Sequence, residues 1–175
     1  MSIGLDRKSE QKNVRDVQLV AFYLEEEEFA VEIQQVKEVL KLSKITPLPQ
    51  ALEFVEGVIN LRGEIIPVID LRKRFDLGAV EKNENNRIVI VEINGSDVGL
   101  IVDAVNEVVR LPEDCIHPAP ADVAGARTDL IKAVGKKENR LIIMLDLESI
   151  LSTEERISLE EVTLSGEETS TEKVE

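Results

Sequence analysis

The strand-like run Gln18-Leu19-Val20-Ala21-Phe22-Tyr23-Leu24 is repeated 69 positions later as Arg87-Ile88-Val89-Ile90-Val91-Glu92-Ile93. The same spacing continues without a gap where Glu28–Leu42 is echoed by Asp97–Leu111. A period near 70 residues is too long for a solenoid repeat. We therefore interpret the chain as two copies of one small lobe.

The spacing grows towards the end of each copy, and the copies differ at one conspicuous place. It reaches 76 where Ile66–Leu71 meets Ile142–Leu147, as insertions in loops between matched strands would produce. Where the first copy has Asn60-Leu61-Arg62-Gly63, the second has Lys136-Lys137-Glu138-Asn139. We expect the lobes to share a scaffold but not a task.

Composition excludes several classes of protein. The net charge of −14 over 175 residues argues against nucleic acid or anionic lipid as the main partner, since both require a basic surface. No apolar run is long enough to span a membrane, and the single cysteine, Cys115, agrees with a reducing compartment. With 3% aromatic residues and no Trp, the core must consist of Val, Ile and Leu. We expect a cytoplasmic protein.

Local patterns predict strands joined by tight turns. Val17–Leu24 is apolar on both faces, and Glu25–Glu28 is interpreted as a solvated turn because it lacks the glycine of a calcium loop. Two β-rich runs, Val55–Leu61 and Glu64–Asp70, flank Arg62-Gly63 as in a hairpin. The sequence predicts an all-β fold with short helices at its corners, and the short, closely spaced strands suggest small barrels.

The domain boundaries follow from the repeat and from the polar ends of the chain. Residues 1–15 are predicted to be a mobile arm, and residues 153–175 an acidic disordered tail. Between them lies one domain, residues 16–152, with lobe one at about 16–78 and lobe two at about 87–152.

Catalytic and metal-binding chemistry is poorly represented. His117 is the only histidine, and it lies near Cys115 in a proline-containing segment without an orienting partner. One His and one Cys do not make a zinc site. Asp70 and Asp146 could be paired carboxylates, but each ends a strand before a helix, which favours helix N-caps. We expect no catalytic residue, metal or cofactor.

The run Gly57-Val58-Ile59-Asn60-Leu61-Arg62-Gly63, within Phe54–Phe75, resembles the signature of CheW-type chemotaxis coupling proteins. The resemblance covers roughly residues 16–152. It implies a fold of two pseudo-symmetric five-stranded SH3-like barrels. It also implies an adaptor without a cofactor, recruited to receptor arrays at the inner face of the membrane. There the adaptor would bridge the cytoplasmic tip of methyl-accepting chemoreceptors to the regulatory domain of the CheA histidine kinase.

The candidate partner-binding residues lie mostly in the first copy: Val36, Glu38, Gly57, Asn60, Arg62 and Gly63, with Val108 in the second. Gly63 is expected in a turn with positive φ, and Gly57 at a bulge or a close backbone approach. Arg62 can make a two-pronged contact with Glu38 or with a partner carboxylate. For Val36 and Val108, a core position remains an equal alternative.

Two other functions stay open at this point. A small acidic hydrolase would use Asp70 or Asp146 as base beside His117. A CheV-like adaptor would have its receiver domain on another chain.

Overall fold

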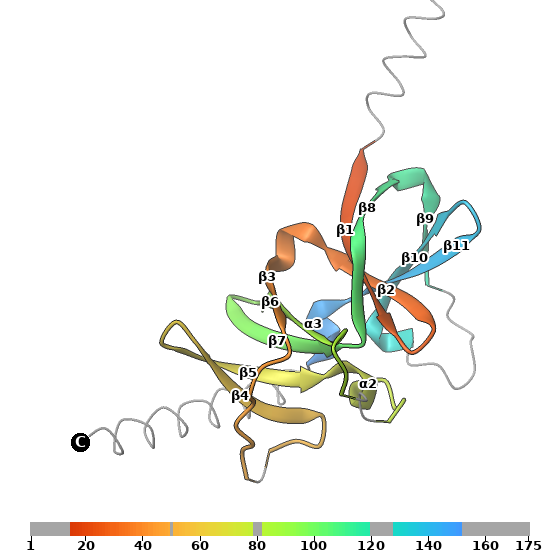
Figure 1. Cartoon of the computed structure of the whole chain (residues 1–175). Helices are drawn as coiled ribbons and strands as arrows, with labels where there is room; N and C mark the ends of the chain where they lie inside the picture. Colours follow the sequence, from red (N-terminus) through yellow and green to blue (C-terminus); the bar gives the residue numbers. More distant parts are fainter. Residues whose placement is uncertain (1–14, 50, 79–81, 120–127, 152–175) are drawn as a thin grey trace, which may run out of the picture.

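The structure is a computed structural model that describes residues 15–49, 51–78, 82–119 and 128–151, and strands dominate it (Figure 1). The arm expected before residue 15 and the tail expected from residue 153 lie outside the described residues.

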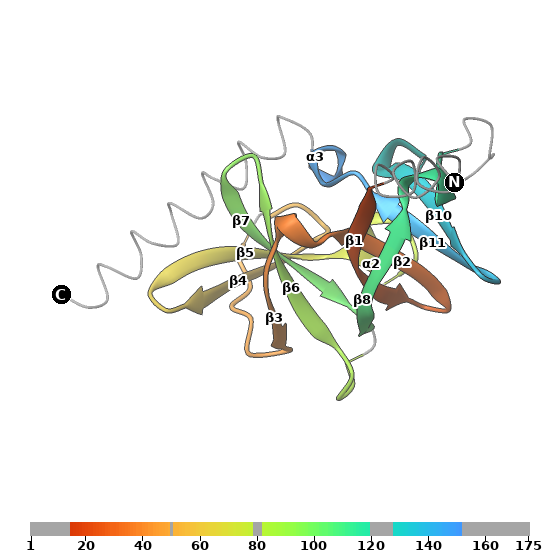
Figure 2. The same ribbon diagram turned by 90° about the horizontal axis from the view of Figure 1, so that it is seen from above.

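The described strands form two sheets that lie side by side (Figures 1 and 2). The six-stranded sheet has the order β8 (Ala104–Pro112), β1 (Asp16–Leu24), β2 (Glu27–Glu32), β11 (Arg140–Leu145), β10 (Ile131–Lys137), β9 (Ile116–Pro118). The five-stranded sheet has the order β3 (Val36–Lys41), β6 (Arg87–Ile93), β7 (Ser96–Val102), β5 (Glu64–Asp70), β4 (Val55–Leu61). Short helices follow the last strand of each copy, α2 (Leu71–Arg74) and α3 (Leu147–Ile150), and 3-10 turns lie at Ile33–Gln35, Glu113–Cys115 and Thr128–Leu130.

The two sheets do not follow the two halves of the sequence. The six-stranded sheet combines β1 and β2 of the first copy with the last four strands of the second, and the five-stranded sheet combines β6 and β7 of the second copy with the last three strands of the first. Strand β1 therefore pairs with β8, and β3 pairs with β6. The expected lobe boundaries, about 16–78 and about 87–152, therefore do not coincide with the sheets. Because the copies offer equivalent strands, a repeat in the sequence cannot tell which copy supplies a strand's partner.

The internal repeat itself is reproduced in detail. The pairing of β3 with β6 shifts between Val36 and Glu38, and the pairing of β8 with β1 shifts at the equivalent positions, Val105 and Glu107. Such β-bulges add one residue to one strand. The all-β fold with short helices is confirmed. One sheet has six strands rather than five because Ile116–Pro118 pairs with β10.

Within the described residues, three apolar clusters form the core. One contains side chains from the six-stranded sheet, such as Leu19 and Ile142, and another contains side chains from the five-stranded sheet, such as Ile66 and Ile88. The largest draws on both sheets and includes Phe22. This shared cluster holds the two sheets together, because burial of apolar area stabilises their contact.

Candidate partner-binding surface

The structure brings six of the seven candidate residues into the five-stranded sheet. Two lie on β3, two on β4 and two in the turn between β4 and β5; in chain order they are Val36, Glu38, Gly57, Asn60, Arg62 and Gly63. The seventh, Val108, lies on β8 in the other sheet.

Glu38 and Arg62 form the expected two-pronged ion pair. Arg62 Nη1 donates to Glu38 Oε1 at 3.3 Å, and Arg62 Nη2 donates to Oε2. Strand β3 is at one edge of its sheet and β4 at the other, so the sheet curls enough to bring the hairpin tip against its opposite edge. The guanidinium holds the pKa of Glu38 below its ordinary value. The Arg62 side chain is still 71% exposed, which leaves it open to a partner.

The turn that carries Arg62 has positive φ values and a side-chain hydrogen bond. Arg62 and Gly63 have φ of 51° and 88°, the positive values that two-residue hairpin turns require. Asn60 Oδ1 accepts a hydrogen bond from Gly63 N at 2.9 Å. The predicted positive φ at Gly63 is confirmed, and Asn60 stabilises the hairpin tip.

Gly57 lies at both of the expected features, a bulge and a close backbone approach. The register of β4 against β5 shifts between Val55 and Gly57. Thr46 exchanges two backbone hydrogen bonds of 2.9 Å with Val58, so its peptide lies directly against Gly57. A Cβ on Gly57 would lie 2.7 Å from the Thr46 carbonyl carbon. Only glycine fits here.

The two candidate valines have different environments. Val36 is half-buried and packs against the core cluster shared by both sheets. Val108 is 53% exposed and is not a core residue. Its counterpart in the first copy is Val39, which is 41% exposed. The edge strands β3 and β8 therefore present an exposed valine at equivalent positions.

A second ion-pair cluster, which the sequence analysis missed, lies in the six-stranded sheet. Arg140 donates to Glu107 Oε1 at 2.9 Å from Nη1, and to Glu28 Oε1 at 3.0 Å from Nε. Glu107 is the counterpart of Glu38, so both copies pair this acid with an arginine of a facing hairpin. A position-by-position comparison does not find Arg140, because the counterpart of Arg62 is Glu138. The sequence signal that could have indicated this cluster is Glu107, because the second copy keeps an acid at the position of Glu38.

Lys37 and Asn106, the bulged residues of edge strands β3 and β8, contact equivalent acids. Lys37 Nζ lies 2.8 Å from Asp97 Oδ1, and its counterpart Asn106 donates to Glu28 Oε2 at 3.1 Å. Asp97 and Glu28 are themselves equivalent. The interpretation of Glu25–Glu28 as a solvated turn is wrong for Glu28, which is buried beneath these contacts.

The residues considered for catalysis lie in structural roles. Asp70 caps α2, since its Oδ1 accepts from Arg72 N at 3.0 Å. Asp146 occupies the N-cap position of α3, but its carboxylate accepts from the Ser149 hydroxyl, at 2.9 Å, rather than from the helix backbone. His117 is exposed on β9. Among the described residues, no three His, Cys, Asp or Glu side chains are grouped as metal ligands.

Comparison with known proteins decides the family. The profile of the CheW-like domain matches residues 18–155. The chain belongs to the CheW-like domain family. Over 136 residues it is 38% identical to the chemotaxis protein CheW of Bacillus subtilis (strain 168), covering 78% of this chain and 87% of that protein.

A solved structure and a longer relative complete the comparison. The crystal structure of the scaffolding protein TtCheW from Thermoanaerobacter tengcongensis superposes on this CheW-like chain with a TM-score of 0.75 and 42% identity, covering 81% of this chain and 96% of that one. The chemotaxis protein CheV3 of Helicobacter pylori (strain ATCC 700392 / 26695) is 28% identical over 150 residues, which cover 84% of this chain and 47% of CheV3. Within the described part of this CheW-like chain, no helix has the length and apolar character needed to cross a membrane.

Proposed function

We propose that this chain is a non-enzymatic adaptor that couples chemoreceptors to the CheA histidine kinase in bacterial chemotaxis. Membership of the CheW-like family supports this proposal, as does the similarity to proteins named chemotaxis and scaffolding proteins. Its partners are the regulatory domain of CheA and the cytoplasmic tip of methyl-accepting chemoreceptors. It acts in the cytoplasm, recruited to receptor arrays at the inner face of the membrane.

The observation that carries the proposal is the exposed guanidinium of Arg62, paired with Glu38 at a turn that the Asn60 side chain closes. A side chain that is already ordered loses less conformational entropy when a partner binds. A planar guanidinium also matches a carboxylate on that partner. The curled five-stranded sheet and the edge strand β8 then offer different surfaces, so one body can contact two partners.

The test uses Arg62→Ala. It measures binding to each partner, and formation of the ternary complex of this chain with the CheA regulatory domain and the chemoreceptor tip. We expect its melting temperature to remain close to that of the wild type, because the pair is exposed. Affinity for at least one partner should fall about tenfold or more, since losing a charged contact at an interface is costly. The matched control is Glu138→Ala, at the equivalent turn position in the second copy. Wild-type affinity of Arg62→Ala for both partners would refute the role of this site.

A charge swap separates two ways in which Arg62 could act. If Glu38→Arg with Arg62→Glu recovers part of the binding lost in each single reversal, the pair acts by ordering the surface. If it does not, Arg62 contacts a partner carboxylate directly. Both outcomes place Arg62 in the binding surface, and they distinguish a contact with Glu38 from a contact with a partner carboxylate.

The hydrolase alternative has a separate test. His117→Ala with Cys115→Ala should leave coupling of receptor to kinase nearly unchanged, because the proposed surface contains neither side chain. Loss of coupling in a folded double variant would favour chemistry at that segment. The CheV-like alternative is supported less than a CheW-type adaptor, since the chain is 28% identical to CheV3 and 38% identical to the Bacillus subtilis CheW.

A further inference from the structure

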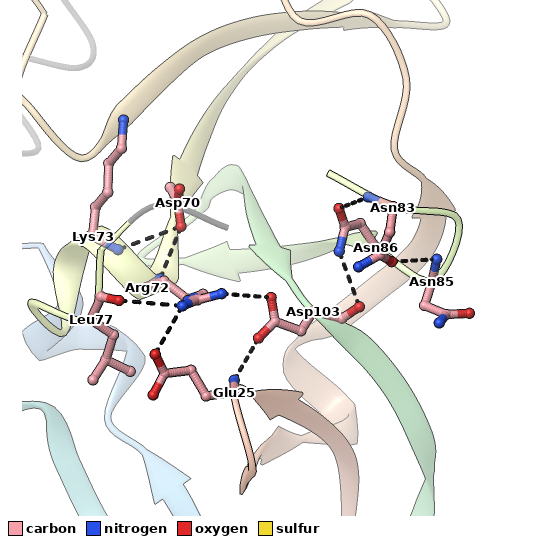
Figure 3. Close-up of polar contacts among 9 residues, drawn as sticks. All are labelled: Glu25, Asp70, Arg72, Lys73, Leu77, Asn83, Asn85, Asn86 and Asp103. Carbon is pink, nitrogen blue, oxygen red and sulfur yellow. Dashed lines mark hydrogen bonds and ion pairs between the residues drawn. The ribbon is translucent and has the colours of Figure 1, made fainter. Parts of the chain in front are cut away.

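Asp103 is the single residue between β7 and β8, where the chain passes from the five-stranded sheet to the six-stranded sheet. Its backbone N–H donates to Tyr23 O at 3.0 Å, and its carbonyl accepts from Asn86 Nδ2 at 3.2 Å. Its carboxylate accepts from Glu25 N and lies 3.6 Å from Arg72 Nη1 (Figure 3). The crossing point is therefore held from both sheets.

Arg72 joins the same cluster from α2, directly after β5 of the five-stranded sheet. Its Nη2 donates to Glu25 Oε1 at 2.8 Å, in the turn between β1 and β2 of the other sheet (Figure 3). The Arg72 side chain is only 14% exposed. Asp103 and Glu25 both face this mostly buried guanidinium, and we name these three residues the inter-sheet cluster.

The second copy does not repeat this cluster. The counterparts of Glu25, Arg72 and Asp103 are Asn94, Glu148 and Gln34, which cannot form a cationic centre between two acids. At the other crossing point, between β2 and β3, Gln34 is exposed and the neighbouring Ile33 packs against the shared apolar core. One crossing between the sheets is ionic and the other is apolar.

The inter-sheet cluster lies close in the chain to both candidate surfaces, the one around Arg62 on the five-stranded sheet and the one around Val108 on β8. Asp103 immediately precedes β8, the strand that presents Val108, and α2 immediately follows β5, the hairpin partner of the strand leading to Arg62. The inter-sheet cluster therefore adjoins β8, which carries Val108, and β5, which pairs with the strand that leads to Arg62. Arg72 Nε is buried without a hydrogen-bond partner among the described residues. An unpaired buried donor weakens the folded state, so stability alone does not account for this arrangement.

We propose that Arg72 is a positioning residue that fixes the two sheets relative to one another and so couples partner binding on one sheet to partner binding on the other. The inference rests on the proposed function for its two partners. Coupling of this kind is a free energy shared between two sites and must be reciprocal. The ionic contacts of Arg72 supply this coupling free energy, because they form only when α2 and the β1–β2 turn keep their present relative position.

The first experiment measures the affinity of the CheA regulatory domain with and without saturating receptor fragment. We expect the two affinities to differ by at least about fivefold in the wild type, and by less than about twofold in Arg72→Met, which keeps the apolar stem and removes the charge. Affinity for each partner alone should change by less than about threefold. The control is Lys73→Met, on the same helix, because Lys73 Nζ pairs with Glu56 Oε1 at 2.6 Å within the five-stranded sheet.

Coupling that persists in Arg72→Met, or that is lost equally in Lys73→Met, would overturn the inference, as would its absence from the wild type. Should Arg72→Met not fold, Glu25→Gln removes the more exposed acid of the cluster, 45% exposed, and should lower the coupling in the same direction. Retained coupling in that variant would likewise overturn it.

A second measurement keeps this inference separate from the proposed function. Spin labels at Lys41→Cys on β3 and Lys136→Cys on β10, in a Cys115→Ser background, report the distance between the sheets from exposed positions. We expect a broader or shifted distance distribution in Arg72→Met and an unchanged one in Lys73→Met. If neither partner binds the wild type, the proposed function fails, and an unchanged distribution in Arg72→Met refutes the positioning role independently.

Discussion

Arg140 donates to both carboxylate oxygens of Glu28, from Nε at 3.0 Å and from Nη2, although the two residues lie 112 positions apart. The pair joins β11 to β2, neighbouring strands that run parallel. Glu28 is 8% exposed. Asn106 donates a further bond to the same carboxylate. A buried carboxylate is thus satisfied by one arginine and one amide, which links the first strands of one copy to the last strands of the other.

Removing the cation should leave Glu28 buried with only its bond to Asn106. We expect Arg140→Met to lower the free energy of unfolding by about 1–3 kcal/mol, the usual cost of an unsatisfied buried polar group. Urea denaturation measures this change in the free energy of unfolding. The control is Glu107→Gln, which removes the more exposed acid at Arg140 Nη1 and should have little effect. Equal losses in both variants would contradict the assignment of the stability to the buried pair.

The same pair should make stability depend on pH in the acid range. The Arg140 hydrogen bonds hold the pKa of Glu28 below its ordinary value of 4.5. The contribution of Glu28 is complete above that ordinary value, and it disappears as the pH falls through the lower pKa of the folded state. The difference in unfolding free energy between wild type and Glu28→Gln should therefore shrink between neutral pH and about pH 3. A difference that is constant with pH would contradict this prediction.

Gly57 and Gly63 should respond differently to the same substitution. Gly57→Ala must displace the Thr46 peptide and weaken its two hydrogen bonds to Val58, in addition to the strain of a φ of +148°. We expect a loss of about 2–5 kcal/mol. Gly63→Ala meets no atom within 4 Å, so only backbone strain of about 1–2 kcal/mol remains. Thermal or urea unfolding of both variants tests the order, and a larger loss at Gly63 would refute it.

The hydrogen bond from Gly63 N to Asn60 Oδ1 should stabilise the β4–β5 hairpin. We expect Asn60→Ala to lower the free energy of unfolding by about 0.5–1.5 kcal/mol. Amide hydrogen exchange should show faster exchange at the turn. The counterpart in the second copy is Lys136, which is exposed and has no side-chain acceptor. Lys136→Ala should leave stability unchanged, and an equal loss there would show that the Asn60 bond contributes nothing.

Local chemistry allowed several features to be predicted from the sequence. Gly57 was expected at a bulge or close backbone approach and Gly63 in a turn with positive φ, and the geometry of both is confirmed. The pair of Glu38 with Arg62 was expected with the help of the family resemblance, and its geometry is also confirmed. Asp70 was expected as an N-cap and acts as one. Whether these residues bind a partner remains a prediction.

Other features depended on contacts between segments far apart in the chain. The burial of Glu28 requires Arg140, and nothing in the run Glu25–Glu28 distinguishes its last acid from its first. The inter-sheet cluster joins Glu25, Arg72 and Asp103 from three separate turns or crossings. No local pattern relates these positions, since each is an ordinary charged residue next to a strand end.

The sequence by itself determined that the chain is all-β, that it contains one unit twice, and which positions of the two copies correspond. Those properties follow from the alternation, turn residues and bulge positions of single segments, which act over a few residues. Only the tertiary structure decided that β1 pairs with β8 and β3 with β6. Equivalent copies offer equivalent strand partners, so that choice depends on how the whole chain closes around the core shared by both sheets.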